Sequence, residues 1–206
     1  MEIPVSSLSW QEGYKILSGS ILPRPIAFVT TMDNSGNVNA APFSFFTAVC
    51  ANPLLVCFSP MRKGTDGKKK DTLLNIEETG EFVINIVSRS MAEKMNICAA
   101  DYAREVNELE MAGLEQERSA SVKPPRIKRS QVHLECTLHQ LLHFGDGPGS
   151  GSLVIGMVRH VQVNDDLYHN GKIDTEKLDP VGRLAGHMYT GPLADVFEII
   201  RKSDPG

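Results

Sequence analysis

The chain has 206 residues, of which 41% are hydrophobic and 22% charged, as in an ordinary globular protein with one domain. Its net charge of −4, from 21 basic and 25 acidic residues, excludes a general attraction to nucleic acid or anionic lipid. No apolar run approaches the roughly 18 residues of a membrane span, and residues 1–10 lack the pattern of a secretory signal. We therefore expect a single cytoplasmic domain over residues 1–206.

Three strands are predicted in the first 60 residues. Residues 26–31 form an apolar, β-branched run after a proline, which is typical of a strand start. Turn-forming residues at 33–36 separate this run from residues 39–51, which we expect to pair back against it. A second turn at Asn52-Pro53 leads into the unbroken apolar run 54–59, which indicates a strand buried on both faces.

A basic loop at residues 61–72 precedes the first predicted helix. Asp71 or Thr72 is expected to accept a backbone N–H at the helix start, and Gly80 is expected to end the helix. Residues 81–87 then alternate between apolar and polar side chains, as a strand does.

Two short helices and a connection are predicted in the middle of the chain. Ser90 and Glu93 have the spacing of a capping box, which predicts a helix as far as about residue 100. Residues 104–112 are expected to form a second short helix. Residues 115–130 are polar and contain two adjacent prolines, so we expect an exposed connection there.

Two long strands are predicted in the last third of the chain. Residues 131–144 alternate, a loop rich in glycine and serine follows, and residues 153–163 continue as a strand. The alternation changes at Gly156, which indicates a bulge or a close backbone approach. The tail at 183–202 fits a helix or a strand, and we favour the strand. Six or seven strands with short helices predict a mostly β protein built as an antiparallel barrel.

Residues 39–46 have the composition of a site for a planar ligand with a polar tail. Small residues let a ligand approach the backbone, three phenylalanines offer flat apolar walls, and Ser44 adds a hydroxyl. Thr30 and Thr31 add hydroxyls from the neighbouring strand. The alternative interpretation is an ordinary core strand that bends at Pro42.

The lysine loop is a second candidate site. Three lysines at 68–70 precede the helix start, where free N–H groups and the partial positive charge of the helix favour a phosphate. Thr72 adds a hydroxyl at the same place. The alternative is a solvated basic loop before an ordinary helix.

A third candidate lies near the C-terminus. Arg183 can bind a phosphate or carboxylate in bidentate fashion, and Tyr189 can stack or donate a hydrogen bond. A turn with a surface arginine explains the same residues. The motifs of a Rossmann dinucleotide fold, a P-loop ATPase and an α/β-hydrolase do not occur in the sequence.

Histidines and cysteines give no prediction of a metal site. Even spacing places His133, His139 and His143 on one face of a strand, but separations of about 20 Å and about 13 Å prevent them from sharing a metal. The four cysteines form no CxxC pair, and we expect buried thiols.

The candidate segments occur in a fixed order that resembles a known family. The order is RPIAFVTTMDNSGNVNAAPFSFF, NPLLVCFS, KKKDTLLNI with TGEFVIN, and finally GRLAGHMY. This series is similar to the flavin reductase-like family with the FMN-binding split-barrel fold, which includes flavoredoxin-type proteins, and the similarity spans about residues 20–200. Two positions depart from the family pattern, with Leu54 in place of a second proline and Ala185 where glycine is frequent.

The resemblance implies a six-stranded antiparallel split barrel with short decorating α-helices. It also implies a homodimer that holds one FMN per subunit near the interface. The segment 41–44 would border the flavin ring or ribityl chain, and Thr30 and Thr31 would contact the ribityl–phosphate side. Ser59 and the block 70–72 would hold the phosphate. The tail motif would close over the cofactor. The positions so assigned are Thr30, Thr31, Ala41, Pro42, Phe43, Ser44, Ser59, Lys70, Asp71, Thr72, Arg183 and Tyr189.

The resemblance is compatible with a flavin-binding protein that has no redox role, and with two activities. The first is an NAD(P)H-dependent flavin reductase, in which a nicotinamide passes a hydride to flavin N5 and a monooxygenase or another electron acceptor uses the reduced flavin. The second is a tightly bound FMN electron carrier with little NAD(P)H oxidation. In both, FMN carries the chemistry and no protein residue is required as an acid or base. The residues do not distinguish NADH from NADPH.

Overall fold

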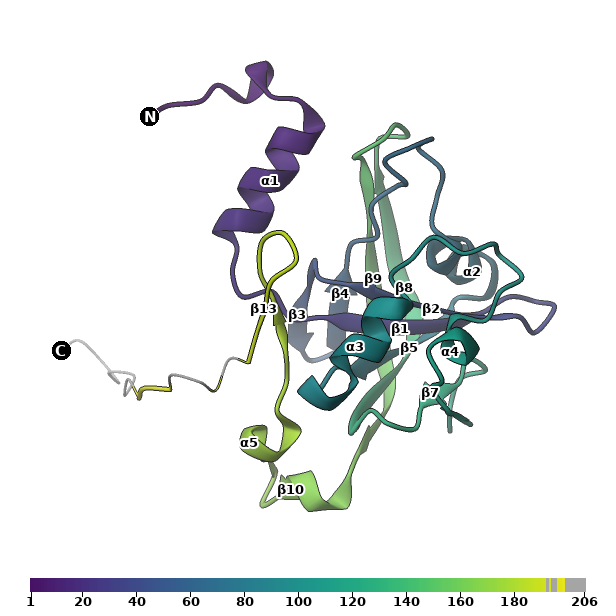
Figure 1. Cartoon of the computed structure of the whole chain (residues 1–206). Coiled ribbons are helices and arrows are strands. Elements are labelled where there is room, and N and C mark those ends of the chain that lie inside the picture. Colours follow the sequence, from purple (N-terminus) through teal and green to yellow (C-terminus); the bar gives the residue numbers. More distant parts are fainter. Residues whose placement is uncertain (192, 194–195, 199–206) are drawn as a thin grey trace.

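The computed structural model describes residues 1–191, 193 and 196–198 (Figure 1). One large antiparallel sheet forms the body, short helices cover it, and the N-terminal helix stands away from it (Figure 1). None of the helices in the described part is long and apolar enough to cross a membrane. The mostly β, antiparallel character predicted from the sequence is confirmed.

The main sheet has seven strands in the order β2-β1-β5-β8-β9-β4-β3, one more than the resemblance implied. These strands are β1 Ala27–Met32, β2 Val38–Phe43, β3 Phe46–Ala51, β4 Leu54–Phe58, β5 Glu81–Ile86, β8 Val132–Phe144 and β9 Gly151–Val163. Three short hairpins add β6 Gln116–Glu117, β7 Arg126–Ile127, β10 Tyr168–His169, β11 Lys172–Ile173, β12 Gly182–Arg183 and β13 Tyr189–Thr190. The helices are η1 Val5–Ser7, α1 Trp10–Ser20, α2 Asp71–Thr79, η2 Arg89–Met91, α3 Ala92–Ile97, α4 Glu108–Met111, η3 Asp165–Leu167 and α5 Thr175–Leu178.

The two edge strands of the sheet follow each other directly in the chain. Only Ser44 and Phe45 separate β2 from β3, although these strands lie at opposite ends of the strand order. The sheet therefore curls until its edges approach at residues 44–45, which we call the seam. Beside it, the Ser59 N–H donates to the Phe45 carbonyl (2.8 Å) and continues the pairing of β3 with β4. The edges are not paired as strands, so the sheet is an open barrel. The prediction that residues 39–51 all pair with the first strand is wrong, because their second half pairs with β4.

The core lies on both faces of the sheet, as β1 shows. Phe28 packs on one face with Met95 and Leu109, beneath α3 and α4. Val29 packs on the other face, inside the barrel, in the same cluster as Phe58. Successive side chains of β1 point to opposite faces of the sheet, and both faces are buried. This explains why the apolar run of the strand is continuous.

Gly156 lies where a side chain has no room, as the change in alternation predicted. A Cβ at this position would lie 2.3 Å from Cζ of Phe82, whose ring is fully buried. The pairing of β8 with β9 also shifts register between Leu138, opposite Gly156, and Gln140, opposite Ile155. The prediction of a close approach and a bulge is confirmed.

Helix α1 is the longest of the elements that the sequence prediction missed. Ser9 and Glu12 form a capping box: the Ser9 hydroxyl accepts from the Glu12 N–H (3.3 Å), and the Ser9 N–H donates to Glu12 Oε2 (2.8 Å). The S-x-x-E pattern was visible in the sequence and signals a helix start. α1 has a single buried residue, Ser18.

The other predicted helix boundaries need correction. The first residue of α2 is Asp71, and its N-cap is Lys70, whose side chain makes no capping hydrogen bond. Ser90 does not cap a helix, because it lies in η2 and its hydroxyl bonds the Ser88 hydroxyl (3.0 Å). The helix expected over 104–112 is limited to α4, because the Asn107 side chain accepts the Leu109 N–H and starts the helix there.

The predicted exposed connection at 115–130 packs against the sheet. Val122 and Ile127 are buried, and the Glu135 carboxylate on β8 accepts backbone N–H groups from Ala120 (2.8 Å) and Ser121 (2.6 Å). The tail expected as a strand over 183–202 forms the β12–β13 hairpin, while residues 196–198 have no regular structure. Residues 192, 194, 195 and 199–202 of that prediction lie outside the described residues.

Candidate functional site

A small, open hollow with a cavity volume of about 80 Å³ lies between the edge strand β2, the start of α2 and the segment that follows α3. We call it the edge hollow. Its lining residues are Asn39, Ala41, Pro42, Phe43, Lys70, Asp71, Thr72, Cys98, Ala99, Ala100, Asp101, Tyr102 and Glu108. It brings together two segments predicted as binding sites, 41–43 and 70–72, which are far apart in the sequence.

The free edge of β2 forms one wall of the edge hollow. The Ala40 N–H donates to Glu108 Oε2 (2.9 Å), so the backbone at this position points away from β1. Pro42 lies two residues further on and faces the same way, but it has no N–H to donate. The edge therefore presents carbonyl groups, and the missing N–H at Pro42 disfavours pairing with a further strand. A ligand with hydrogen-bond donors fits this edge.

The start of α2 forms the opposite wall. The N–H groups of the first helical turn, at Asp71 and Thr72, lack partners within the helix and carry its partial positive charge. Lys70 is the one lysine of 68–70 that lines the hollow, and its ammonium pairs with Asp101. The neighbouring Lys69 pairs with Glu77 (2.6 Å). Much of the predicted positive charge is therefore already balanced by acidic side chains.

A buried polar network forms the floor of the edge hollow. The Thr72 side chain is fully buried and lies 2.8 Å from the Asn39 amide. When the Asn39 oxygen accepts from the Thr72 hydroxyl, its nitrogen donates to Glu108 Oε1 (3.2 Å). The network joins α2, β2 and α4, so it fixes the relative positions of the two walls.

Glu108 is the ionisable group most constrained by this floor. It is 7% exposed, and burial raises the pKa of its carboxyl above the ordinary value, while the hydrogen bond from Ala40 acts in the opposite direction. The carboxyl therefore holds a proton more tightly in the folded chain than in the unfolded chain.

We expect the Glu108→Gln variant to become more stable relative to the wild type as the pH rises. Because the pKa is raised on folding, the free energy of unfolding of the wild type falls as the pH rises through this pKa, and glutamine has no such titration. The amide oxygen still accepts from Ala40. Urea unfolding at about pH 4 and about pH 7 measures the difference between the two proteins. A difference that is constant, or that shrinks towards neutral pH, would contradict the assigned direction.

The other predicted hydroxyls do not line the edge hollow. Thr30 and Thr31 are fully buried, with the Thr30 hydroxyl donating to the Pro125 carbonyl and the Thr31 hydroxyl accepting from the Asn75 amide (3.1 Å). They tie β1 to neighbouring segments. Ser44 and Ser59 lie at the seam, and the Ser44 hydroxyl accepts from Nε of Arg24 (3.3 Å).

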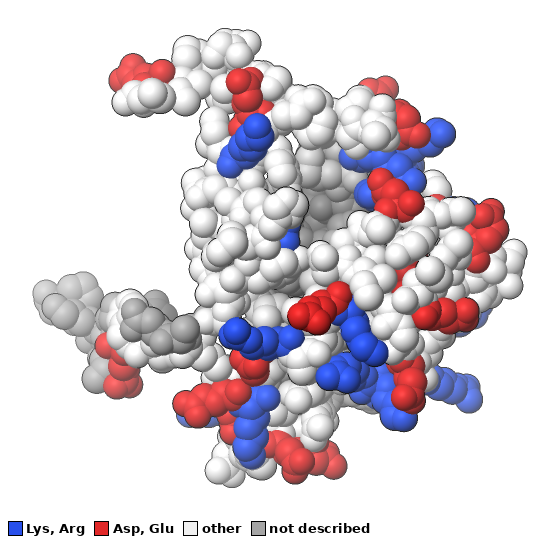
Figure 2. All heavy atoms as spheres, viewed as in Figure 1, with Lys and Arg blue, Asp and Glu red and all other residues white. Residues whose placement is uncertain are grey.

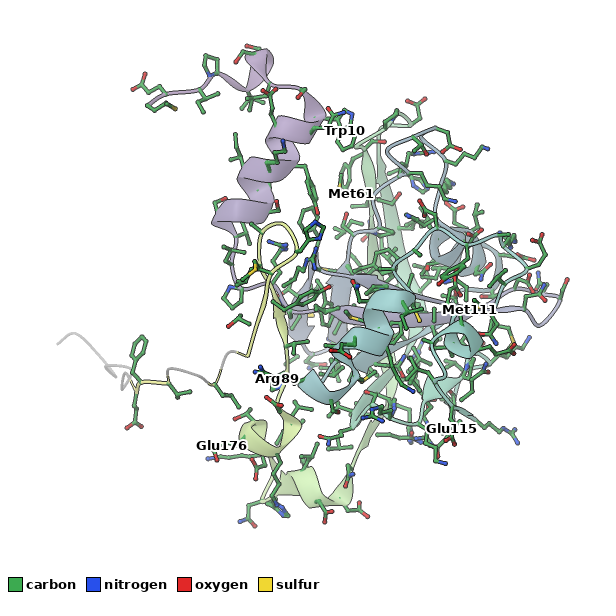
Figure 3. The ribbon with its side chains drawn as sticks, viewed as in Figure 1. Trp10, Met61, Arg89, Met111, Glu115 and Glu176 are labelled. Carbon is green, nitrogen blue, oxygen red and sulfur yellow. The ribbon has the colours of Figure 1, made fainter. Side chains whose placement is uncertain are left out.

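The C-terminal motif forms a separate structure. Arg183 lies over the Tyr189 ring, 4.5 Å from its centroid, within the β12–β13 hairpin. The Tyr189 hydroxyl donates to Asn96 on α3 (3.3 Å). Tyr189 lines a second hollow, with a cavity volume of about 320 Å³, together with Arg89, which Figure 3 labels. The structure therefore does not bring Arg183 and Tyr189 into the edge hollow.

Sequence reasoning missed several residues of the edge hollow. Residues 98–100 were assigned to the end of a helix, residues 101 and 102 to no element, and Glu108 to the interior of a second helix. No local pattern marks either of them, because their role depends on contact with β2, some 60 residues earlier in the chain. Asn39 lay inside the predicted segment 39–46 but was not selected.

The cysteines only partly follow the prediction of buried thiols. Cys98 and Cys136 are buried, and burial raises the pKa of each thiol to about 12. Cys57 is half-buried. Cys50 is exposed in the single chain, because β3 leaves most of its residues uncovered. The prediction is therefore wrong for Cys50. The described residues contain no group of three or more potential metal ligands.

The fold and the edge hollow define an open antiparallel barrel that can hold a small ligand at the edge of its sheet. The family model of the flavin reductase like domain matches residues 18–177, and the chain belongs to this family. An uncharacterised protein of Halalkalibacterium halodurans is 42% identical over 203 residues, covering 98% of this chain and 96% of that protein.

Two solved structures are similar over their whole length. Nitrilotriacetate monooxygenase component B from Bacillus cereus has a TM-score of 0.91 and 38% identity, covering 97% of this chain and 98% of that chain. Pseudomonas fluorescens 2-nitrobenzoate 2-nitroreductase has a TM-score of 0.83 and 32% identity, covering 100% and 99%. The resemblance seen in the sequence motifs is confirmed, and the chain is a flavin reductase-like oxidoreductase.

Proposed function

We propose that this chain binds FMN and acts as an NAD(P)H-dependent flavin reductase that supplies reduced flavin to a monooxygenase or another electron acceptor. The observation that carries the proposal is the edge hollow, in which the free edge of β2 faces the first turn of α2. The family assignment supports flavin chemistry, and the similarity to a monooxygenase component B supports a partner that consumes reduced flavin.

The residues of the edge hollow fit a flavin mononucleotide. Small side chains at Ala41, Ala99 and Ala100 leave room for a flat ring, and the carbonyl-bearing edge at Pro42 suits the donor groups of that ring. The N–H groups at the start of α2 suit a phosphate.

In this proposal, each segment of the chain has one task. Segment 41–43 borders the ring, and the start of α2 with Lys70 holds the phosphate. Thr30 and Thr31 support the walls from behind, and Ser44 with Ser59 fixes the seam beside the ring. FMN supplies a ring that accepts a hydride and releases electrons singly or in pairs. The chain's contribution is to bind, to orient and to exclude water, and no side chain has to move a proton for hydride transfer.

An anaerobic titration tests the reductase activity. The FMN-loaded protein is mixed with NADH or NADPH, and flavin absorbance is followed over seconds. We expect either nucleotide to bleach the flavin absorbance, and we expect each further addition of free FMN to be bleached in turn. If the colour survives both nucleotides and disappears with dithionite, the chain is an electron carrier and the reductase proposal fails. A protein that takes up no FMN would overturn both.

We also propose that the chain forms a homodimer through β3. This edge strand is exposed over five of its six residues, and Val49 is 47% exposed. A free apolar edge of this kind is normally covered by a partner. A second copy packed on β3 would also lie close to the seam at 44–45, beside the edge hollow.

Val49→Asp is expected to give a monomer and to accelerate thiol labelling of Cys50. A buried aspartate without a partner opposes association, and a free β3 leaves the adjacent thiol accessible. Sedimentation and the rate of reaction with a thiol reagent measure the two effects. Ile173→Asp on β11, another exposed apolar residue, is the control and should change neither. A monomeric wild type, or a Val49→Asp dimer with unchanged labelling, would contradict a β3 interface.

A further inference from the structure

The segment that follows α3 closes one side of the edge hollow and passes across α2 (Figure 1). We call residues 98–104 the strap. Its first five residues line the edge hollow, and residues 101–103 have no regular secondary structure. The side chains at 99, 100 and 103 are alanine methyl groups, so the contacts that hold the strap depend on its few larger residues.

Two charged side chains attach the strap to α2. Nη2 of Arg104 donates to Asn75 Oδ1 (3.0 Å), and Nη1 lies 3.7 Å from Asp71 Oδ1. The Asp101 carboxylate pairs with the ammonium of Lys70 (2.5 Å), the residue that precedes the helix. Arg104 does not line the edge hollow, whereas Asp101 and Lys70 both line it. The Asp101–Lys70 pair is therefore the attachment that a ligand in the hollow meets.

The Asp101 carboxylate is ionised at neutral pH and is free to change partners. The hydrogen bond from Lys70 and the positive charge of its ammonium hold the pKa of Asp101 below its ordinary value. The Asp101 side chain is 56% exposed and that of Lys70 is 31% exposed. Ion pairs at this exposure contribute little to stability, because water screens them. A stronger anion can therefore take the place of the carboxylate at Lys70.

A phosphate monoester is such an anion. It carries about two negative charges at neutral pH, whereas a carboxylate carries one. The start of α2 adds unpaired N–H groups on the same side of the hollow. A phosphate that takes Lys70 leaves Asp101 unpaired beside it, and the two like charges repel. Figure 2 shows acidic side chains next to the basic ones around the lysine loop, in the upper right of the view, so no broad basic patch on this face offsets that repulsion.

Two other carboxyl groups line the edge hollow, but neither pairs with Lys70 in the part of the chain that the structure describes. Asp71 faces Arg104 instead. Glu108 is buried and accepts from the Ala40 N–H. Asp101 is therefore the acidic group that determines how much of the Lys70 charge is available to a ligand.

We propose that Asp101 competes with the phosphate of FMN for Lys70, so that it limits the affinity of the chain for FMN but not for riboflavin, which has no phosphate. The inference rests on the proposed function, because it assigns a role to a residue at the phosphate end of the proposed FMN site. A flavin that is held below its full affinity can leave after each reaction, which suits a chain that supplies reduced flavin to a partner.

Asp101→Asn is the variant that tests the competition. Asparagine keeps the size of the side chain and removes its charge, and the exposed position leaves the core intact. We expect the Kd of FMN to fall about tenfold, because Lys70 becomes available and the repulsion disappears, while the Kd of riboflavin stays unchanged. Titration of each flavin with the protein, followed by flavin fluorescence, measures both values.

Glu105→Gln is the matched control. It removes the same charge from the same loop, but Glu105 is exposed and does not line the edge hollow, so neither Kd should change. Equal FMN affinities in the Asp101→Asn and Glu105→Gln variants would overturn the inference. So would an equal gain for FMN and riboflavin, because the effect would then not involve the phosphate. A wild type that binds neither flavin would overturn the proposed function itself.

Combining Asp101→Asn with Lys70→Ala separates competition from a general effect of charge. In the wild type, Lys70 is already paired with Asp101, so Lys70→Ala should weaken FMN binding only moderately. In the Asp101→Asn background, the full attraction of Lys70 for the phosphate is lost, and the loss should be at least about threefold larger. Equal losses in the two backgrounds would show that Asp101 and Lys70 act independently, which would contradict the competition.

Discussion

Replacing Gly156 by alanine is expected to destabilise the protein by about 3 kcal/mol, at the upper end for overpacking of a core. The new methyl group would lie 2.3 Å from Cζ of Phe82 and 3.2 Å from each of the two Cε atoms of the same ring. The Phe82 ring is fully buried and packs edge-on against Phe58, with centroids 5.6 Å apart. It therefore has no free space into which it can withdraw.

Urea unfolding measures this effect as a lower midpoint at an unchanged slope. Gly147→Ala is the control, because a Cβ there meets nothing within 4 Å, and its free energy of unfolding should stay within about 0.5 kcal/mol of the wild type. If Gly156→Ala were as stable as this control, the close approach of β9 to Phe82 would be incorrect.

Ala100→Trp is expected to weaken FMN binding at least about a hundredfold, equivalent to about 2.8 kcal/mol. Ala100 lines the edge hollow between Ala99 and Asp101, which also line it, and an indole would occupy the space proposed for the flavin. Because Ala100 is exposed in the free chain, the substitution leaves the core intact. Titration of the protein with FMN, followed by flavin fluorescence, measures the change in Kd.

Ala103→Trp is the matched control for this experiment. Ala103 lies in the same loop and is also exposed, but it does not line the edge hollow. Its FMN affinity should equal that of the wild type. Equal affinities for the Ala100 and Ala103 variants would place the flavin outside the edge hollow.

The strands were predictable because their signals are local. The run at 26–31 and the alternation at 81–87 each reflect burial of the strand itself, and both strands form as expected. The separation of segment 39–51 into two edge strands was not predictable in this way. It depends on which neighbouring strand pairs with each half, β1 with the first and β4 with the second, and no residue near Ser44 specifies where the division falls.

Predictions of helix starts are limited by tertiary contacts in the same way. The S-x-x-E pattern forms a capping box at Ser9, but Ser90 with the same spacing forms none, because its hydroxyl bonds Ser88 instead. Local pattern therefore indicates where a cap is chemically available, and the tertiary contacts determine whether it forms.

The residues of the candidate site also differ in how far the sequence predicts them. Segments 41–43 and 70–72 were predictable because small residues on a strand and lysines before a helix have local meaning. Thr30 and Thr31 were selected for their hydroxyls, but both side chains are buried and their hydroxyls bond to other parts of the chain, which the sequence does not reveal. Glu108 enters the site through a hydrogen bond to Ala40, a contact between segments 68 residues apart.

A crystal structure of the protein with FMN tests the central claim most directly. The account predicts one FMN per chain, with its phosphate at the N–H groups of Asp71 and Thr72 and its ring along Ala41, Pro42 and Phe43. Electron density for the cofactor in another part of the molecule, or a protein that does not bind FMN at all, would contradict it.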